Sequence, residues 1–267
     1  MPNLNINFGS FNLSCLEKVY VPLMVCSHER SGTHFMMNSI SKCTEYTASP
    51  FLNFDYHPLG SVVNFFSEQS IRNFLNSIKN IHHNSLNYST NSIIKSHFPL
   101  TLLGNNDQNI CKVIYIYRNP EEVFISFWRF LNKWDWFEGP KLNSPLELMK
   151  SNPKGQSQRY QVENYKNYFE RWALHIINAK EAQSYSNNIV MVNYSDLEKN
   201  YKKTVKNICN QLDIDIVSTL SKPIREDYIH GKDMKISYKD KKIMKSYISK
   251  EIKKFPELPN DLLNLFS

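Results

Sequence analysis

Short apolar runs alternate with amphipathic segments along the chain, a pattern typical of parallel α/β proteins. Runs rich in β-branched residues predict buried strands at 19–27, 91–97, 112–117 and 189–194. Apolar residues at helical spacing predict helices at 33–43, 120–134, 162–184 and 197–212. Strands that alternate with helices join through right-handed crossovers into a parallel sheet. We therefore expect a three-layer α/β/α fold with a central parallel sheet.

Two further segments complete the expected order of elements. Residues 239–253 predict a basic C-terminal helix, whereas residues 140–158 contain turn residues and little periodicity, so we expect a mobile lid there. Asp196 is placed to cap the helix over 197–212. No repeat and no long Gly-, Ser- or Pro-rich linker divides the chain, so residues 1–267 are expected to form one domain.

Polar clusters follow the predicted strands where each strand ends. They are HERSGT at 28–33, KSH at 95–97, RNP at 118–120 and YSD at 194–196. Ligands of parallel α/β sheets bind beyond the carboxyl ends of the strands. The four clusters together therefore predict one binding site at that edge of the sheet.

Composition narrows the class of protein and its surroundings. The net charge of +7 favours polyanionic partners, although an excess of lysine at 232–254 also fits a solvated helix face. No apolar run approaches the roughly 20 residues that cross a bilayer, and the N-terminus lacks signal-peptide features, so we expect a cytoplasmic protein. Five widely spaced cysteines without a CxxC motif argue against a disulfide framework or a zinc site.

The loop at 28–34 has the features of a phosphate cradle. A strand-to-helix loop presents free backbone N–H groups to an anion, Gly32 permits close approach, and Arg30 adds a fixed positive charge. The loop is not a Walker A motif, which needs two glycines and a Lys before Ser or Thr. Taken alone, the segment is a weak signal that a plain strand-to-helix turn explains better.

A second basic site follows the strand at 112–117. Arg118 emerges at the sheet edge, and Pro120 suits the first turn of a helix. Ser126 lies eight residues after Arg118, so the guanidinium and the hydroxyl can converge on one phosphate. A helix-capping Arg and a buried Ser would explain the same residues without a ligand.

Four segments, in the right order, resemble sulfotransferases that use 3′-phosphoadenosine 5′-phosphosulfate (PAPS). VCSHERSGTHF resembles the 5′-phosphosulfate loop P-K-S-G-T-T-W, and RNPEEVFIS at 118–126 resembles the 3′-phosphate motif R-N-P-x-D-x-x-x-S. KSHFP at 95–99 resembles the K-T-H-L-P segment with the catalytic His, and VNYSDL resembles Y-E-D-L. The resemblance covers residues 19–212 and implies a P-loop-like fold.

The resemblance also implies a role for each matching residue. His97 would be the general base, with Arg30 and Lys95 stabilising charge on the leaving product, PAP. The residues that would hold the nucleotide are Arg30, Ser31, Gly32, Thr33 and His34 at the 5′-phosphate, Arg118 and Ser126 at the 3′-phosphate, and Phe35 and Tyr194 at the adenine. No metal ion is expected.

Several positions depart from the family pattern. Glu29 replaces the loop Pro and would bring a carboxylate close to the cofactor, and Arg30 replaces Lys, so its role must be electrostatic. His34 replaces a Thr, which leaves the choice of base between His97 and another group open. The C-terminal R-K-G segment is not clearly present, and the nearest residues are Arg225, His230, Gly231 and Lys232.

The expected partner is a small-molecule acceptor, with no nucleic acid and no membrane span. Aromatic segments at 51–56 and 128–137 would line a pocket for a flat or cationic molecule, or would pack in the core instead. A saxitoxin-like guanidinium alkaloid becomes attractive if Glu29, Asp55, Asp135 or Glu138 face that pocket. The function classes that remain open are an ATP-dependent kinase and a non-catalytic protein that binds PAP or another anion.

Overall fold

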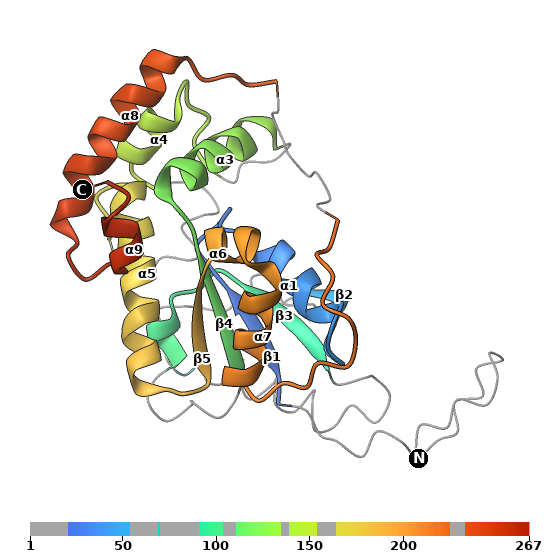
Figure 1. Cartoon of the computed structure of the whole chain (residues 1–267). Helices are drawn as coiled ribbons and strands as arrows, with labels where there is room; N and C mark the ends of the chain where they lie inside the picture. Colours follow the sequence, from blue (N-terminus) through green and yellow to red (C-terminus); the bar gives the residue numbers. More distant parts are fainter. Residues whose placement is uncertain are drawn as a thin grey trace.

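The computed structural model describes residues 21–53, 69, 91–103, 111–134, 139–153, 164–224 and 233–266. Within them, five parallel strands form one sheet in the order β2-β3-β1-β4-β5 (Figure 1). The strands are β1 Leu23–Cys26, β2 Thr47–Asn53, β3 Ser92–Ser96, β4 Lys112–Tyr117 and β5 Ile189–Asn193. The expected parallel sheet is confirmed, and β1 lies at its centre between β3 and β4.

Helices cover both faces of the sheet (Figure 1). One face carries α1 Thr33–Ser41, α6 Tyr194–Lys199 and α7 Tyr201–Gln211. The other carries α3 Pro120–Lys133, α4 Pro145–Lys150, α5 Tyr168–Tyr185, α8 Tyr238–Glu251 and α9 Asn260–Leu263. Short 3₁₀ helices occur at Leu100–Leu103 and Ile252–Lys254. This is the expected three-layer α/β/α arrangement.

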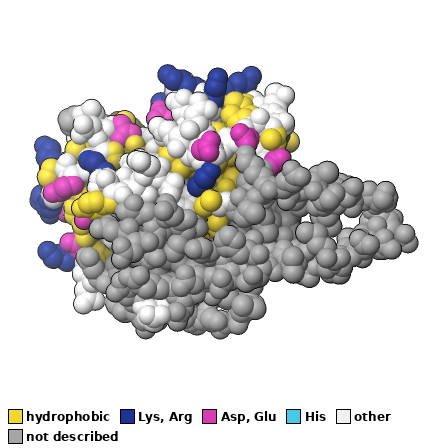
Figure 2. Space-filling model, turned by 90° about the horizontal axis from the view of Figure 1, so that it is seen from below, with side chains coloured by type: hydrophobic (Ala, Val, Ile, Leu, Met, Phe, Trp, Pro, Cys, Tyr) yellow, Lys and Arg dark blue, Asp and Glu magenta, His cyan; other side chains and the backbone are white. Residues whose placement is uncertain are grey.

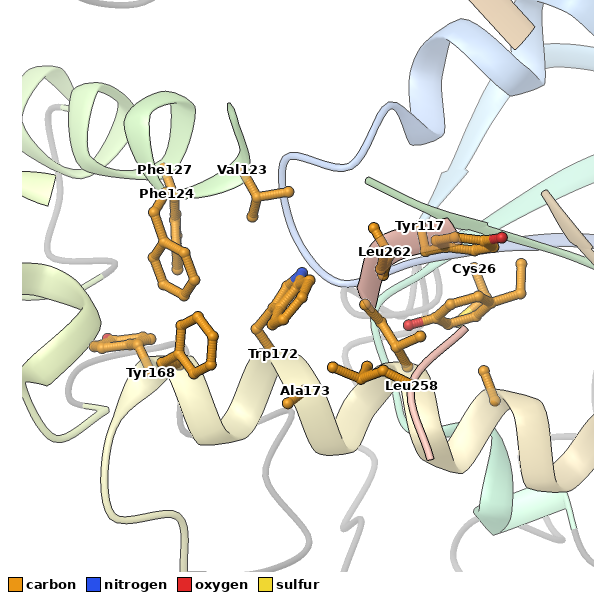
Figure 3. Close-up of a cluster of buried hydrophobic side chains, with 14 of the residues drawn as sticks. Cys26, Tyr117, Val123, Phe124, Phe127, Tyr168, Trp172, Ala173, Leu258 and Leu262 are labelled. Carbon is orange, nitrogen blue, oxygen red and sulfur yellow. The ribbon is translucent and has the colours of Figure 1, made fainter. Parts of the chain in front are cut away.

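The two cores follow from the alternation of side chains along each strand. Leu23 and Val25 of β1 pack with α1 and α7, whereas Met24 and Cys26 belong to the larger core under α3, α5 and α8. Aromatic side chains dominate that larger core, where Phe124 and Phe127 of α3 meet Tyr168 and Trp172 of α5 (Figure 3). Both faces of the sheet are buried, which explains why the strands read as continuous apolar runs.

The helix boundaries differ from the expected ones where a polar side chain caps the backbone. α5 begins at Tyr168 because Asn167 accepts a hydrogen bond from the Glu170 N–H. The helix predicted at 197–212 is two helices, since the chain breaks at Asn200, whose φ is −120° and ψ is 41°. Asn193, not Asp196, caps the first of them by accepting from the Ser195 N–H at 2.8 Å.

The prediction of a lid at 140–158 is wrong for its described part, residues 140–153. Ser144 caps helix α4, and the side chains of Leu148 and Met149 are fully buried against α3, α5 and α8. One apolar pair in a six-residue helix is too short to give a visible period. Residues 154–158 lie outside the described part of the chain.

The C-terminal basic helix is confirmed as α8, which buries Met244 and Ile248 and leaves its lysines on the surface. On the face seen from below, Lys and Arg side chains lie together with Asp and Glu among the described residues (Figure 2). Such a mixture of positive and negative side chains is typical of a solvated surface. In the described ranges, every helix is too short or too polar to cross a membrane.

Candidate active site

A tight loop between β1 and α1 forms the centre of the site. Gly32 is the N-cap of α1 and has φ 107°, a conformation that L side chains rarely adopt. A Cβ at this position would lie 2.4 Å from Tyr194 Cδ2. Glycine is therefore required twice, by the backbone turn and by the close approach of Tyr194. Arg30 also has a positive φ, 65°, so the loop is strongly curved.

The hydroxyl groups of the loop differ in their partners. Ser27 Oγ lies 2.7 Å from Thr33 Oγ1. Ser31 is fully buried, and its Oγ has no hydrogen-bond partner within the described residues. A buried hydroxyl without a partner is costly, so it marks a position where a ligand atom would complete the hydrogen bonding. An anion held by the loop fits this requirement.

Two arginines lie at this loop, Arg30 within it and Arg118 from the segment after β4. Arg30 Nε donates to Ser126 Oγ on α3 at 3.1 Å, and its guanidinium lies 5.0 Å from the ring centroid of Phe130. Arg118, which follows β4, stacks 4.2 Å from the ring centroid of Tyr194 and donates to Glu122 at 2.6 Å. Burial, and then the charge of Arg118, lower the pKa of Arg30 to about 10. The two guanidinium groups therefore share one region.

His34 and Lys95 extend the same cationic region. His34 reaches solvent, yet desolvation by the surrounding protein and the charges of Lys95 and Arg30 lower its pKa to about 4. His34 is therefore neutral near pH 7. Lys95 lies at the end of β3, where its backbone pairs with Val25 of β1. The parallel register thus brings Lys95 to the edge of the sheet from which the loop departs.

His97 follows β3 and lies against the start of the loop. Its Nδ1 is 2.8 Å from the Ser27 carbonyl oxygen, so Nδ1 carries the proton and donates it. The lone pair of the neutral ring is then at Nε2. Burial and the charge of Lys95 hold the pKa of His97 well below its usual value. The imidazole is therefore neutral and able to accept a proton at Nε2.

A family model for the sulfotransferase domain matches residues 22–256. The chain belongs to this sulfotransferase family. The predicted membership is therefore confirmed.

Solved structures of sulfotransferases resemble this one at low sequence identity. Mouse sulfotransferase SULT7A1 complexed with PAP is 19% identical, with a TM-score of 0.44 over 74% of this chain and 61% of that chain. Retinol dehydratase with androsterone and PAP is 15% identical, with a TM-score of 0.46 over 89% and 67%. The sulfotransferase of Alicyclobacillus acidocaldarius is 10% identical, with a TM-score of 0.52 over 93% and 96%, and it supports the fold. The chain spans 61% of the mouse protein's length.

The residues predicted to bind the nucleotide lie together in this chain, but with unexpected pairings. Arg118 and Ser126 were expected to converge, whereas Ser126 accepts from Arg30 and Arg118 stacks on Tyr194. Phe35 and Tyr194 lie edge to face, with ring centroids 6.1 Å apart. Both rings are buried beside the loop.

The carboxylate of Glu29 lies elsewhere than predicted. Glu29 was expected close to the cofactor, but its two oxygens accept from Arg171 Nη2 at 2.8 and 2.9 Å inside the core. No local motif signals this pair, because Arg171 lies 142 residues away on α5. Arg171 also lies off the apolar face that Phe169, Trp172 and Ile176 define, so the helical pattern gives no hint of the pair either.

Lys222 is a second residue that the sequence analysis missed. Its Nζ lies 5.9 Å from the ring centroid of Phe35 and donates to the Glu198 carbonyl oxygen. It therefore adds a cation on the side of the site formed by Phe35. The C-terminal residues that were considered instead, 225 and 230–232, lie outside the described residues.

Proposed function

We propose that this sulfotransferase moves a sulfuryl group from PAPS to a hydroxyl or amine of a small-molecule acceptor. The observations that carry the proposal are the buried loop with an unsatisfied Ser31 hydroxyl and the guanidinium groups of Arg30 and Arg118, which lie close enough for their charges to interact. An anionic ligand would satisfy the hydroxyl and neutralise the cations. When bound, PAPS supplies the activated sulfuryl group and a stable leaving product, PAP.

The nucleotide would be held by the groups already close to the loop. The backbone N–H groups at the start of α1, together with Ser31 and Thr33, suit the 5′-phosphate. Arg118 and Ser126 suit the 3′-phosphate, which distinguishes PAPS from ATP. Phe35 and Tyr194 offer aromatic surfaces for the adenine. None of these contacts needs a metal ion, because cationic side chains supply the positive charge.

His97 is the proposed general base. Its Nδ1–H is engaged with Ser27, so an acceptor proton would move to Nε2. The depressed pKa keeps the ring neutral, and therefore ready to accept a proton, across the physiological range. Glu29 is excluded from this role by its bonds to Arg171, whereas His34, which is also neutral, stays the second candidate.

Arg30 and Lys95 would stabilise the charge that develops during transfer. Sulfuryl transfer resembles phosphoryl transfer, in which positioning and electrostatics do most of the catalysis. Arg30 is held by Ser126 and Phe130, so its guanidinium is oriented before any ligand binds. An oriented cation loses little free energy to reorganisation when charge develops beside it.

The aromatic and acidic side chains in the described part of the site limit which class of acceptor can be proposed. Trp128 is buried in the core, so the packing interpretation holds for this aromatic of the segment 128–137. Glu29 no longer supports a cationic acceptor, because Arg171 neutralises it. The other carboxylates considered, Asp55, Asp135 and Glu138, lie outside the described residues. A saxitoxin-like alkaloid stays a prediction that rests on them alone.

A thermal-shift titration tests the donor. PAP should raise the melting temperature by mass action, equally with and without EDTA, and more than ATP with magnesium does. Transfer of labelled sulfate from PAPS to a panel of phenols, alcohols and amines then tests the reaction. A magnesium-dependent shift with ATP and none with PAP would favour the kinase. A PAP shift without transfer to any acceptor would favour the non-catalytic protein.

A further inference from the structure

Helix α5 places two buried polar side chains, one turn apart, against two different parts of the site. Arg171 binds both carboxylate oxygens of Glu29 in the loop, and its Nη1 lies 3.2 Å from His28 Nε2. His175 Nε2 lies 2.9 Å from the carbonyl oxygen of His97. Each of the two α5 side chains is only 1% exposed. A helix that otherwise packs aromatic core thus also contacts the loop and the base segment.

The hydrogen bonds of this cluster fix which ring nitrogen of His28 and of His175 carries the proton. Arg171 can only donate, so His28 Nε2 accepts, and His28 Nδ1–H donates to the Glu29 carbonyl oxygen at 3.1 Å. His175 must donate from Nε2 to the His97 carbonyl, so its Nδ1 accepts from Tyr115 Oη at 2.6 Å. The histidines are neutral, because burial lowers the pKa of His28 to about 3 and that of His175 to about 4.

Glu29 and Arg171 form the charged pair of the cluster. Desolvation raises the pKa of Glu29, but the charge and hydrogen bonds of Arg171 outweigh it and hold that pKa below its usual range. Glu29 immediately precedes Arg30, whose backbone has the positive φ. The pair therefore anchors the loop at the residue before its sharpest turn.

These contacts close a ring through the site. The Ser27 carbonyl accepts from the His97 ring, the His97 carbonyl accepts from His175, and Arg171 on the same helix returns to Glu29, two residues after Ser27. We propose that Arg171 and His175 are positioning residues that hold the donor loop and the base at one fixed separation before substrates bind. The inference rests on the proposed function, in which this loop binds the donor and His97 accepts the proton.

The two residues should then have separable effects. Arg171 acts on the loop, so its loss should weaken PAP binding. His175 acts on the backbone of His97, so its loss should lower kcat and leave PAP binding unchanged. A misplaced reacting group costs up to about a hundredfold in rate. A purely structural role predicts instead that both effects follow the loss of stability.

The first experiment compares His175→Leu with His175→Gln. In the Leu variant Tyr115 Oη keeps a partner, since it lies 3.2 Å from the His175 carbonyl, so no hydroxyl is stranded. We expect kcat to fall about tenfold or more at saturating PAPS, while calorimetry gives a PAP Kd within about twofold of the parent value. The Gln amide can still donate to His97, so His175→Gln should recover most of kcat.

The second experiment tests the contact between Arg171 and the loop, without leaving a buried charge unpaired. The double variant Glu29→Leu/Arg171→Met replaces a buried ion pair by apolar groups of similar size, which folded proteins often tolerate. We expect the PAP Kd to rise about tenfold or more. Amide hydrogen exchange of residues 27–34 in the ligand-free protein should become faster, whereas exchange in β4 should not change.

The matched control is Ile176→Ala, a buried α5 residue outside the ring. This variant should have a lower melting temperature than the parent protein, with kcat and the PAP Kd unchanged. Full activity of His175→Leu, no rescue by Gln, or an equal loss of kcat in Ile176→Ala would overturn the positioning role. If the parent protein neither binds PAP nor transfers sulfate, the proposed function fails instead. Loop exchange then still decides whether Arg171 orders the loop.

Discussion

Arg30 Nε donates to Ser126 Oγ across 3.1 Å, which joins two motifs that lie 96 residues apart in the sequence. One motif is the loop after β1 and the other is the helix after β4. The bond forms because β1 and β4 are neighbours in the sheet and both lead out at the same edge. It holds the Arg30 side chain against α3, at the edge of the sheet where the proposed donor would bind.

Arg118→Ala should weaken PAP binding selectively. The charged hydrogen bond that the variant removes is worth about 1.5 kcal/mol or more. Adenosine 5′-phosphosulfate lacks the 3′-phosphate, so its affinity should fall much less. Calorimetry with both ligands makes the comparison. Equal losses for the two nucleotides would refute the assignment of Arg118.

Glu122→Gln is the matched variant, because Glu122 is the carboxylate that Arg118 contacts. Glu122 accepts from Arg118 at 2.6 Å and competes with any phosphate for that guanidinium. Removing its charge should leave the PAP affinity unchanged or improve it. A clear loss of PAP affinity in Glu122→Gln would mean that Glu122 orients Arg118 for binding instead of competing with the nucleotide.

His97→Ala should lower turnover by about a hundredfold or more, since removal of a general base typically has that effect. PAP binding should persist, because the loop that would hold the phosphate is intact. Initial rates at saturating PAPS and PAP calorimetry are the two measurements. His34→Ala is the comparison, and a larger loss of turnover there than in His97→Ala would move the base to His34.

Gly32→Ala should destabilise the folded protein by about 1–3 kcal/mol, because the residue has a strained backbone conformation for any L side chain. The new Cβ would also lie 2.4 Å from the ring of Tyr194. Gly139→Ala is the control, where a Cβ would lie 2.9 Å from Leu131 Cδ2, a flexible side-chain end that can move. Urea unfolding should show the larger loss at Gly32, and an equal or smaller loss there would contradict this account.

Stability should fall on acidification below about pH 6.5. The pKa values of His28 and His175 are depressed in the folded state, so the unfolded chain binds protons that the folded chain does not. Each histidine therefore removes about 1.4 kcal/mol per pH unit between its unfolded value near 6.5 and its folded value. Urea unfolding from pH 7.5 to 4.5 measures how the free energy of unfolding changes with pH. In His175→Gln this change should be smaller by the contribution of one histidine, about 1.4 kcal/mol per pH unit. An unchanged pH dependence would mean that His175 does not titrate on unfolding.

The elements around the candidate site were largely predictable. The run at 112–117 is β4 with the same bounds, and Pro120 opens α3 as expected. Such signals are local, since apolar runs, helical periodicity and caps act over a few residues. β2 and α4 were missed because an edge strand and a six-residue helix carry too few apolar positions to form a period.

The sequence by itself determined the order of the strands and helices next to the site, the glycine turn of the loop, and the clustering of basic residues at one sheet edge. Tertiary structure alone decided which of those residues meet. Glu29 bonds to Arg171 inside the core, and His175 supports His97, because packing of α5 places these residues side by side. Pairs so far apart in the sequence depend on strand order and helix packing, and no local pattern of residues encodes them.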